Sequence, residues 1–469
     1  MINGFLMLCA VPFGLYYNES SFKGILVSSL INFIVGFLLY YFSKNNKNKD
    51  LKRRDGFLIV TFSWLIMSIF GMLPYVLTGQ IPSFTNAFFE TVSGYTTTGA
   101  TILDNIESLD YGILFWRSLT QWIGGMGIIV LAVAILPFLG IGGMQLFVAE
   151  APGVSLDKLQ PRIKETAKRL WIIYISFSIL LFFILYAEGM SFFDSINHAM
   201  TTFATGGFST KDASIGYFNS PIIQYTIIVF MLISATNFTL IYFGIQLNFK
   251  KIFNNEEFRI YLSFISILTI VVFSSLLFFD ISSIEETFRI ALFNVVAIVT
   301  TTGFSTADFT GWSEFLTILF FILMFFGAST GSTSGGIKIV RHVILVKNSF
   351  IELKKQIHQS GVFTLRFNNS RVPRDIVFNI LAFMMLYVII FCAGSVIMTL
   401  LGVDFMSAIG SVAATLGNVG PGIGSVGPSN TYTNIPDAGK WILSFLMFIG
   451  RLELFTVLMI LSPFFWRGN

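Results

Sequence analysis

The chain has 469 residues, of which 54% are hydrophobic and 12% are charged, and its formal net charge at pH 7 is +4. Soluble proteins carry about a quarter charged residues, so this composition excludes an ordinary soluble protein and favours one that crosses a membrane several times. Two cysteines and three histidines leave too little material for a disulfide framework, a zinc cluster or a haem site.

Apolar stretches of about 20 residues, the length that crosses a bilayer, are the main feature along the chain. The first lacks the basic start and the A-x-A cleavage site of a signal sequence, so we interpret it as a membrane helix. The eighth is interrupted by glycine, serine and threonine. The ten predicted spans are residues 1–17, 24–42, 57–77, 115–138, 170–187, 222–245, 260–279, 314–345, 376–401 and 441–466.

Positive charge is concentrated in the loops of one side. Residues 44–55, 158–169, 250–259 and 338–374, with Arg467, hold 23 of the 29 Lys and Arg residues. The loops of the other side hold Lys23, Lys211, Arg289 and Lys440. By the positive-inside rule both termini are predicted to be cytoplasmic. The positive net charge therefore indicates topology and gives no support for nucleic-acid binding.

A pattern recurs four times on the outer side, as YTTTGATIL (95–103), FATGGFSTKD (203–212), TTTGFSTAD (300–308) and LGNVGPGIG (416–424). Aligning Gly99, Gly207, Gly303 and Gly420 separates the copies by 108, 96 and 117 residues. Each copy follows a run too short or too polar to span, namely residues 83–94, 192–202, 284–299 and 405–414. The pattern predicts a unit of helix, half-helix, glycine turn and helix.

The predicted fold is an all-α polytopic membrane protein with four pseudo-repeated units around one pore. An N-terminal two-helix hairpin over residues 1–43 stands outside the repeats. The predicted repeats cover residues 57–146, 166–247, 257–346 and 375–467, and the second helix of the third repeat is interrupted.

Such a unit suits cations. Non-helical backbone at membrane depth is tolerated where it lines water or is buried in protein. A half-helix aims the negative end of its dipole at the bilayer centre, extended carbonyls replace a hydration shell, and glycine adopts positive φ without penalty. The predicted filter residues are Thr97, Thr98, Gly99, Thr205, Gly206, Gly207, Thr301, Thr302, Gly303, Asn418, Val419 and Gly420.

Carboxylates flank these loops and are expected to concentrate cations at the outer mouth. For any single carboxylate, plain solvation is the alternative, so the argument rests on their common sign. They are Glu90, Asp104, Glu107, Asp212, Glu285, Glu286 and Asp308.

The interruption of the eighth stretch reads GASTGSTSGGIK, residues 327–338. Each glycine costs a helix about 1 kcal/mol relative to alanine, so we predict a flexible intramembrane loop beneath the filter, with a simple kink as the alternative. A phosphate-binding P-loop fits poorly, because Ile337 stands where the lysine of that motif is required.

Arg451 lies near the middle of the last predicted span, where a charge is costly and therefore a functional candidate. Glu453, two residues on, does not share its helix face. The alternative is an arginine that is paired within the bundle and supports folding.

Residues 115–146, 206–218, 328–341 and 450–467 resemble the Trk/Ktr/HKT superfamily of potassium transporters. The similarity is greatest to the membrane subunits of bacterial Trk systems, which share the N-terminal hairpin that Ktr subunits lack. It covers essentially the whole chain, although the fourth loop, Gly-Asn-Val-Gly-Pro, departs from Thr-Thr-Gly-Phe.

The resemblance implies uptake of potassium across the bacterial cytoplasmic (inner) membrane, with K⁺ as the transported ion, no covalent cofactor and no enzymatic activity. It implies a homodimer embedded in membrane lipid and a cytoplasmic nucleotide-binding regulator of the TrkA type. Residues 347–374 are a docking surface for that regulator or an anchor on the membrane surface. Discrimination between potassium and rubidium stays open. The implied gating residues are Gly327, Gly331, Ser332, Gly335, Gly336 and Arg451.

Three alternatives to potassium uptake can be compared with the sequence. A sodium-permeable or ion-coupled symporter of the same architecture is the alternative, but in plant relatives a serine accompanies sodium passage where this chain has Gly99. An intramembrane enzyme lacks a catalytic constellation, since His198 lies in a half-helix and His342 and His358 are predicted to be cytoplasmic. A receptor or scaffold gives no reason for four filter-like loops.

Overall fold

A computed structural model describes residues 1–43, 53–130, 160–279 and 283–467. In these residues the fold is helical apart from one hairpin of two short strands, β1 (Arg366–Phe367) and β2 (Ser370–Arg371). The predicted loop at residues 44–55, the end of the predicted span 115–138 and the start of the basic segment 158–169 fall largely outside the described residues.

Within the described residues, five helices are long and apolar enough to cross a membrane, and the number rises to seven if each of two bent helix pairs counts as one span. The described residues therefore form a multi-pass membrane protein, as predicted. The five are α3 (Ser21–Ser43), α4 (Arg53–Gly71) continued by α5 (Leu73–Leu77), α10 (Gln160–Ala187), α15 (Glu256–Leu276) and α19 (Arg374–Leu400).

The prediction of one continuous span over residues 1–17 is wrong. The segment forms two short helices, α1 (Ile2–Leu8) and α2 (Val11–Tyr16), which together fall short of a spanning length. Pro12 in the first turn of α2 favours a helix start there, because it has no backbone N–H to donate to the preceding turn. Both helices pack on α3, and the Met1 amine lies 3.5 Å from the Asn32 carbonyl in the middle of that helix.

Two other spans predicted to be continuous are bent. The span 222–245 is divided into α12 (Pro221–Ser234) and α13 (Phe238–Ile245), which meet at 110°, with the Asn237 side chain capping α13 at the Thr239 N–H. The span 441–466 is divided into α21 (Asp437–Arg451), α22 (Leu454–Leu461) and α23 (Pro463–Trp466), and α21 and α22 meet at 119°. Arg451 is thus the last residue of α21, not a mid-helix residue, and Glu453 at φ +67° makes the break.

The four predicted half-helices are present, as α6 (Phe84–Tyr95), α11 (Phe192–Phe203), α16 (Ile284–Val299) and α20 (Phe405–Leu416). All four begin in the same way. A Ser or Asp side chain caps each of them by accepting the N–H three residues further on, which satisfies one of the free donors of a helix start. The caps are Ser83, Ser191, Ser283 and Asp404.

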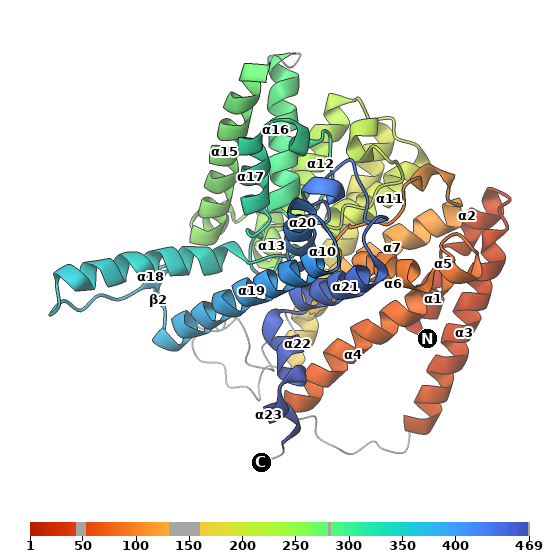
Figure 1. Cartoon of the computed structure of the whole chain (residues 1–469), viewed down its shortest axis with the longest axis horizontal. Coiled ribbons are helices and arrows are strands. Elements are labelled where there is room, and N and C mark those ends of the chain that lie inside the picture. Colours follow the sequence, from red (N-terminus) through yellow and green to blue (C-terminus); the bar gives the residue numbers. More distant parts are fainter. Residues whose placement is uncertain (44–52, 131–159, 280–282, 468–469) are drawn as a thin grey trace.

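The remaining helices connect and cover the half-helices. They are α7 (Tyr111–Val130), α14 (Phe249–Phe253), α17 (Glu314–Leu323) and α18 (Ile339–Ile357). The predicted interruption separates α17 from α18. In Figure 1, α18 and α19 project from one side of the bundle, and the strand pair lies between them. Buried residues such as Ile344, Phe367 and Ile376 hold this projection together.

A glycine lets α7 lie directly against the end of α6. A Cβ on Gly124 would overlap the Tyr95 carbonyl oxygen, whereas among the described residues a Cβ on Gly127 would meet the Trp64 ring alone, at 3.2 Å. Backbone cannot yield as a side chain can, so we expect Gly124→Ala to cost at least the 1–3 kcal/mol typical of overpacking. Thermal unfolding in detergent should show a lower midpoint for Gly124→Ala than for Gly127→Ala. Equal midpoints would contradict this packing.

Candidate functional site

Four loops follow the half-helices, and we number them 1 to 4 in chain order. Their first three positions are Thr97–Thr98–Gly99, Thr205–Gly206–Gly207, Thr301–Thr302–Gly303 and Asn418–Val419–Gly420. The first position has φ of 51°, 52°, 55° and 52°, and the third has φ of 83°, 78°, 77° and 100°. The four loops thus share one backbone path, and glycine occupies the third position because it adopts positive φ without steric cost.

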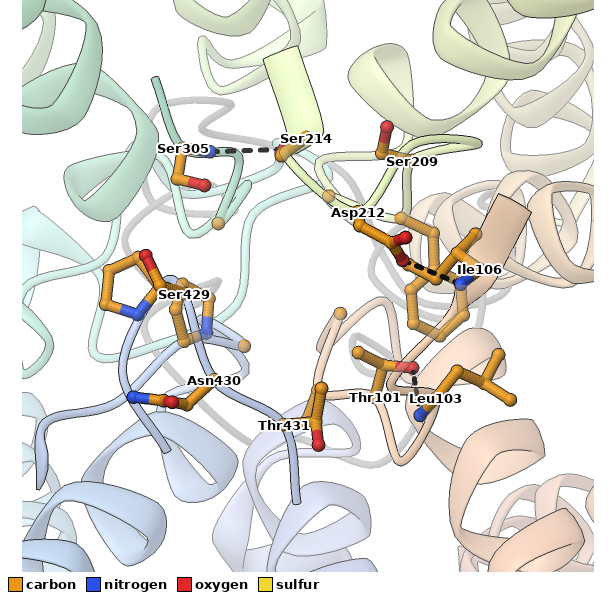
Figure 2. Close-up of a pocket in the computed structure, with 18 of the residues that line it drawn as sticks. Thr101, Leu103, Ile106, Ser209, Asp212, Ser214, Ser305, Ser429, Asn430 and Thr431 are labelled. Atoms are coloured by element: carbon orange, nitrogen blue, oxygen red, sulfur yellow. Dashed lines mark hydrogen bonds between the residues drawn. The ribbon is translucent and has the colours of Figure 1, made fainter. Parts of the chain in front are cut away.

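The loops form a closed ring. A Cβ placed on Gly99 would collide with the Gly206 carbonyl, one on Gly207 with the Thr302 carbonyl, and one on Gly303 with the Val419 carbonyl. A Cβ on Gly420 would lie 2.5 Å from the Thr98 carbonyl, which closes loop 4 on loop 1. The structure therefore brings all twelve predicted filter residues together around one axis, and Figure 2 shows the opening that their outer ends surround.

A cavity of about 130 Å³ lies over the ring, and the third-position glycine of every loop lines it. Its walls are loop segments tied to one another: Asp212 accepts the Ile106 N–H at 2.6 Å and Ser214 accepts the Ser305 N–H at 3.3 Å (Figure 2). Asp104 and Asp212 line the cavity, so two of the predicted carboxylates lie at this mouth.

Glu90 does not belong to the mouth, contrary to the sequence prediction. It is fully buried, pairs with Arg117 at 2.7 Å, and accepts the Thr101 hydroxyl at 2.9 Å and the Ile102 N–H at 3.0 Å. Its charge is neutralised inside the protein, so it braces loop 1 instead of attracting ions. The carboxylate of Glu285 is also paired, since it forms an ion pair with Arg289 at 2.9 Å.

Oxygen atoms at the first position of two loops lack partners. Thr97 Oγ1 and Asn418 Oδ1 are buried, and among the described residues neither has a hydrogen bond. Buried polar atoms are nearly always paired, and an unpaired one calls for an explanation such as a bound ion. Both residues belong to the ring, and the Asn418 carboxamide also lies against α21, where its Nδ2 donates to the Met447 carbonyl at 3.0 Å.

The loop predicted at residues 327–338 lies within the segment 324–338 between α17 and α18, and it lies against the ring. The Gly335 N–H donates to Thr301 Oγ1 at 2.6 Å, and a Cβ on Gly335 would come within 2.7 Å of the Asn418 Cβ. The loop is also attached to the bend between α12 and α13, where the Phe238 N–H donates to the Gly331 carbonyl at 3.1 Å.

Within this loop the predicted gating residues have distinct contacts. The Gly327 N–H donates to the Ile337 carbonyl at 2.8 Å and closes the loop on itself. Ser332 donates to the Ser329 carbonyl at 2.6 Å, and Gly336 has φ of 64° and lies beside Gly327.

Arg451 is buried and reaches the loop from the end of α21. Its Nη1 donates to the Thr333 carbonyl at 2.7 Å and its Nη2 to the Gly124 carbonyl at 3.3 Å. Glu453 pairs instead with Arg341, at 2.6 Å, and no ion pair of the described residues includes Arg451. The guanidinium therefore faces backbone carbonyls of the loop and of α7.

The sequence prediction missed three buried polar residues beside the site. Glu257 in α15 accepts the Thr330 N–H of the intramembrane loop at 2.6 Å. Arg117 and Gln121 in α7 contact loop 2. A signal was present, because polar or charged residues inside or at the start of an apolar span are costly and mark functional positions.

Comparison with known proteins agrees with this geometry. A family model described as TrkH, cation transport protein, matches residues 23–467. The chain is 41% identical to the Trk system potassium uptake protein TrkH of Escherichia coli over 97% of the chain and 94% of that protein. It is 34% identical to the E. coli protein TrkG over 98% of the chain and 95% of that protein.

The fold is also known from a solved structure. The crystal structure of the potassium transporter TrkH from Vibrio parahaemolyticus matches with a TM-score of 0.90 and 39% identity, over 99% of this chain and 96% of that one. From these matches, which run over nearly its whole length, we conclude that the chain belongs to the TrkH family of cation transport proteins.

Proposed function

We propose that this protein takes up potassium through the ring of loops 1 to 4, with the twelve residues of their first three positions as its selectivity filter. The observation that carries the proposal is the closed ring itself, in which four left-handed glycines each pack on a carbonyl of the next loop. The names of its relatives, which are potassium uptake proteins, support the choice of ion.

Physical chemistry supports a cation as the transported ion. Each half-helix ends at the ring, so four negative dipole ends favour a cation there. Backbone carbonyls of the loops are the groups that replace water around the ion in this proposal. The membrane potential supplies about 2.3 kcal/mol per 100 mV for each charge, so transport needs no chemical step and the protein need not be an enzyme.

The intramembrane loop is the proposed gate. Its predicted gating residues, Gly327, Gly331, Ser332, Gly335 and Gly336, lie in a segment bonded to loop 3, to the α12–α13 bend and to Arg451. Further hydrogen bonds join it to α15, through Glu257, and to α12, through Ser234. Movement of these elements is proposed to shift the segment between a position that blocks the path and one that clears it.

Assembly is proposed on the projection formed by α18 and α19. An exposed apolar stripe runs along α18, next to Lys354 and Lys355. It consists of Val346, Phe350, Leu353 and Ile357. Such a stripe supports contact with a second copy and with a cytoplasmic nucleotide-binding regulator of the TrkA type. The basic loops support a cytoplasmic position for this side in the inner membrane. The proposed division of the chain is unchanged. It consists of the hairpin at 1–43 and the repeats at 57–146, 166–247, 257–346 and 375–467.

Ion flux tests the proposal. The purified protein in liposomes should carry potassium and rubidium under an inward-negative potential and carry sodium at least tenfold more slowly. Adding the regulator should change the rate and leave the ratio of ions unchanged. Equal sodium flux would support the sodium-permeable alternative, and a requirement for a proton or sodium gradient would support a coupled symporter. Absence of potassium flux would refute the proposal.

A further inference from the structure

Loop 2 lacks a brace that loops 1 and 3 contain. In loop 1 the hydroxyls of Thr96 and Thr98 are hydrogen-bonded at 2.8 Å, and in loop 3 Thr300 and Thr302 make the same bond at 2.8 Å. The equivalent positions of loop 2 are Ala204 and Gly206, which carry no hydroxyl. Something outside loop 2 must therefore hold it in the same path.

Gln121 of α7 lies where a side chain at position 206 of loop 2 would be and makes the hydrogen bonds that brace this loop. Its amide nitrogen donates to the Gly206 carbonyl at 2.6 Å, and its amide oxygen accepts the Phe208 N–H at 3.0 Å. The three heavy atoms nearest to a Cβ built on Gly206 all belong to the Gln121 carboxamide. A side chain of the first repeat thus fills the space of a second-position side chain in the second repeat.

Arg117 lies one helical turn before Gln121 and joins loops 1 and 2. Its Nε donates to Glu90 at 2.7 Å, and Glu90 in turn holds Thr101 and Ile102 of loop 1. Its Nη1 donates to the Ser209 carbonyl at 3.0 Å, and its guanidinium lies 3.5 Å from the centre of the Phe208 ring. Arg117, Glu90 and Gln121 are each at most 2% exposed.

We infer that Glu90, Arg117 and Gln121 form a clamp that sets ion selectivity by fixing the spacing between loops 1 and 2. The inference rests on the proposed function and assigns these residues a positioning role, because they act through the loops. Discrimination by cavity size and discrimination by the number of coordinating carbonyls both require loops held at constant spacing.

Loop 4 also lacks the hydroxyl pair, because Gly417 and Val419 stand at its equivalent positions. However, its own Asn418 donates to Thr98 Oγ1 at 2.9 Å and to the Met447 carbonyl at 3.0 Å. Loop 2 is braced from α7 instead.

Two variants remove the clamp in different ways. Gln121→Met keeps the length of the side chain and loses both hydrogen bonds. Glu90→Gln with Arg117→Gln removes both charges together, so that no buried charge is left unpaired. The matched control is Glu285→Gln with Arg289→Gln. That pair lies on α16, and Arg289 contacts Gln224 of α12 instead of a ring loop.

We expect the ratio of potassium to sodium flux in liposomes to fall at least tenfold in both clamp variants and to stay within twofold of the wild type in the control. A purely structural role would lower the amount of folded protein and leave this ratio unchanged. If the double variant does not fold, the flux ratio of Gln121→Met still tests the clamp, because this variant leaves the ion pair of Glu90 and Arg117 intact.

A rescue variant tests the mechanism. Gly206 does not have positive φ, and Gln121→Ala clears the space beside it. Gln121→Ala with Ala204→Thr and Gly206→Thr therefore gives loop 2 the threonine pair that loops 1 and 3 carry. Its flux ratio should lie closer to the wild type than that of Gln121→Ala alone. Wild-type ratios in both clamp variants would overturn the clamp, provided that the wild type itself prefers potassium. A wild type without potassium flux would instead refute the proposed function.

Discussion

Gly303→Ser should remove most of the preference for potassium over sodium, lowering the flux ratio at least tenfold while the protein still folds. Gly303 has φ of 77°, and a Cβ there would collide with the Val419 carbonyl of loop 4 and lie 2.9 Å from the Pro421 ring. The left-handed conformation costs a non-glycine residue about 1–2 kcal/mol, and relief of the collision moves a carbonyl of the ring. Flux of potassium, rubidium and sodium into liposomes measures the effect.

Gly402→Ser is the matched control for this substitution. Gly402 has φ of 86°, and none of the described heavy atoms lies within 4 Å of a Cβ built there. It therefore adds the same backbone strain without touching the ring, and its flux ratio should equal that of the wild type. If Gly303→Ser and the equivalent changes at Gly99, Gly207 and Gly420 all kept the wild-type ratio, the assignment of the filter would be wrong.

Arg451→Gln should raise basal potassium flux by at least an order of magnitude. A charge about 6 Å from an ion costs about 3 kcal/mol at an effective dielectric constant of 20, roughly a hundredfold in ion occupancy. The side chain also holds the intramembrane loop, through Thr333, against α7, through Gly124. Removing it lowers the electrostatic barrier and releases the loop.

Arg451→Lys separates these two effects. Lysine keeps the charge but lacks the planar fork that reaches two carbonyls at once. Because Arg451 uses both ends of its fork, we expect Lys to resemble Gln and to raise flux. If Lys behaved like the wild type, charge alone would control the barrier. Poor expression of both variants with normal flux per folded molecule would show that Arg451 serves folding instead of gating.

Local sequence was sufficient to predict the half-helices and their loops. The run predicted at residues 83–94 is α6, Phe84–Tyr95, and the run at 405–414 is α20, Phe405–Leu416. Their boundaries depend on a capping side chain that accepts the N–H three residues further on and on a glycine that tolerates positive φ. Both signals lie within a few residues, so they can be read without knowledge of the fold.

The bends could not be predicted in this way. Hydropathy measures how apolar a stretch is and contains no information on whether the helix axis bends. The sequence therefore predicted one span for residues 222–245 and one for residues 441–466. The first bend is stabilised by a bond from Phe238 to Gly331, far along the chain. The second depends on Glu453 in a conformation that non-glycine residues rarely adopt.

The sequence by itself determined that this is a membrane protein with four repeated units of half-helix and glycine turn, because composition, span length and glycine spacing are local properties. Tertiary structure alone decided which side chains serve the ring. Glu90 looks like a mouth carboxylate in the sequence, yet folding buries it against Arg117, 27 residues away. Gln121 meets Gly206 across 85 residues. The first contact lies within repeat 1 and the second where repeat 1 packs on repeat 2, and both depend on the packing of whole helices that local sequence does not specify.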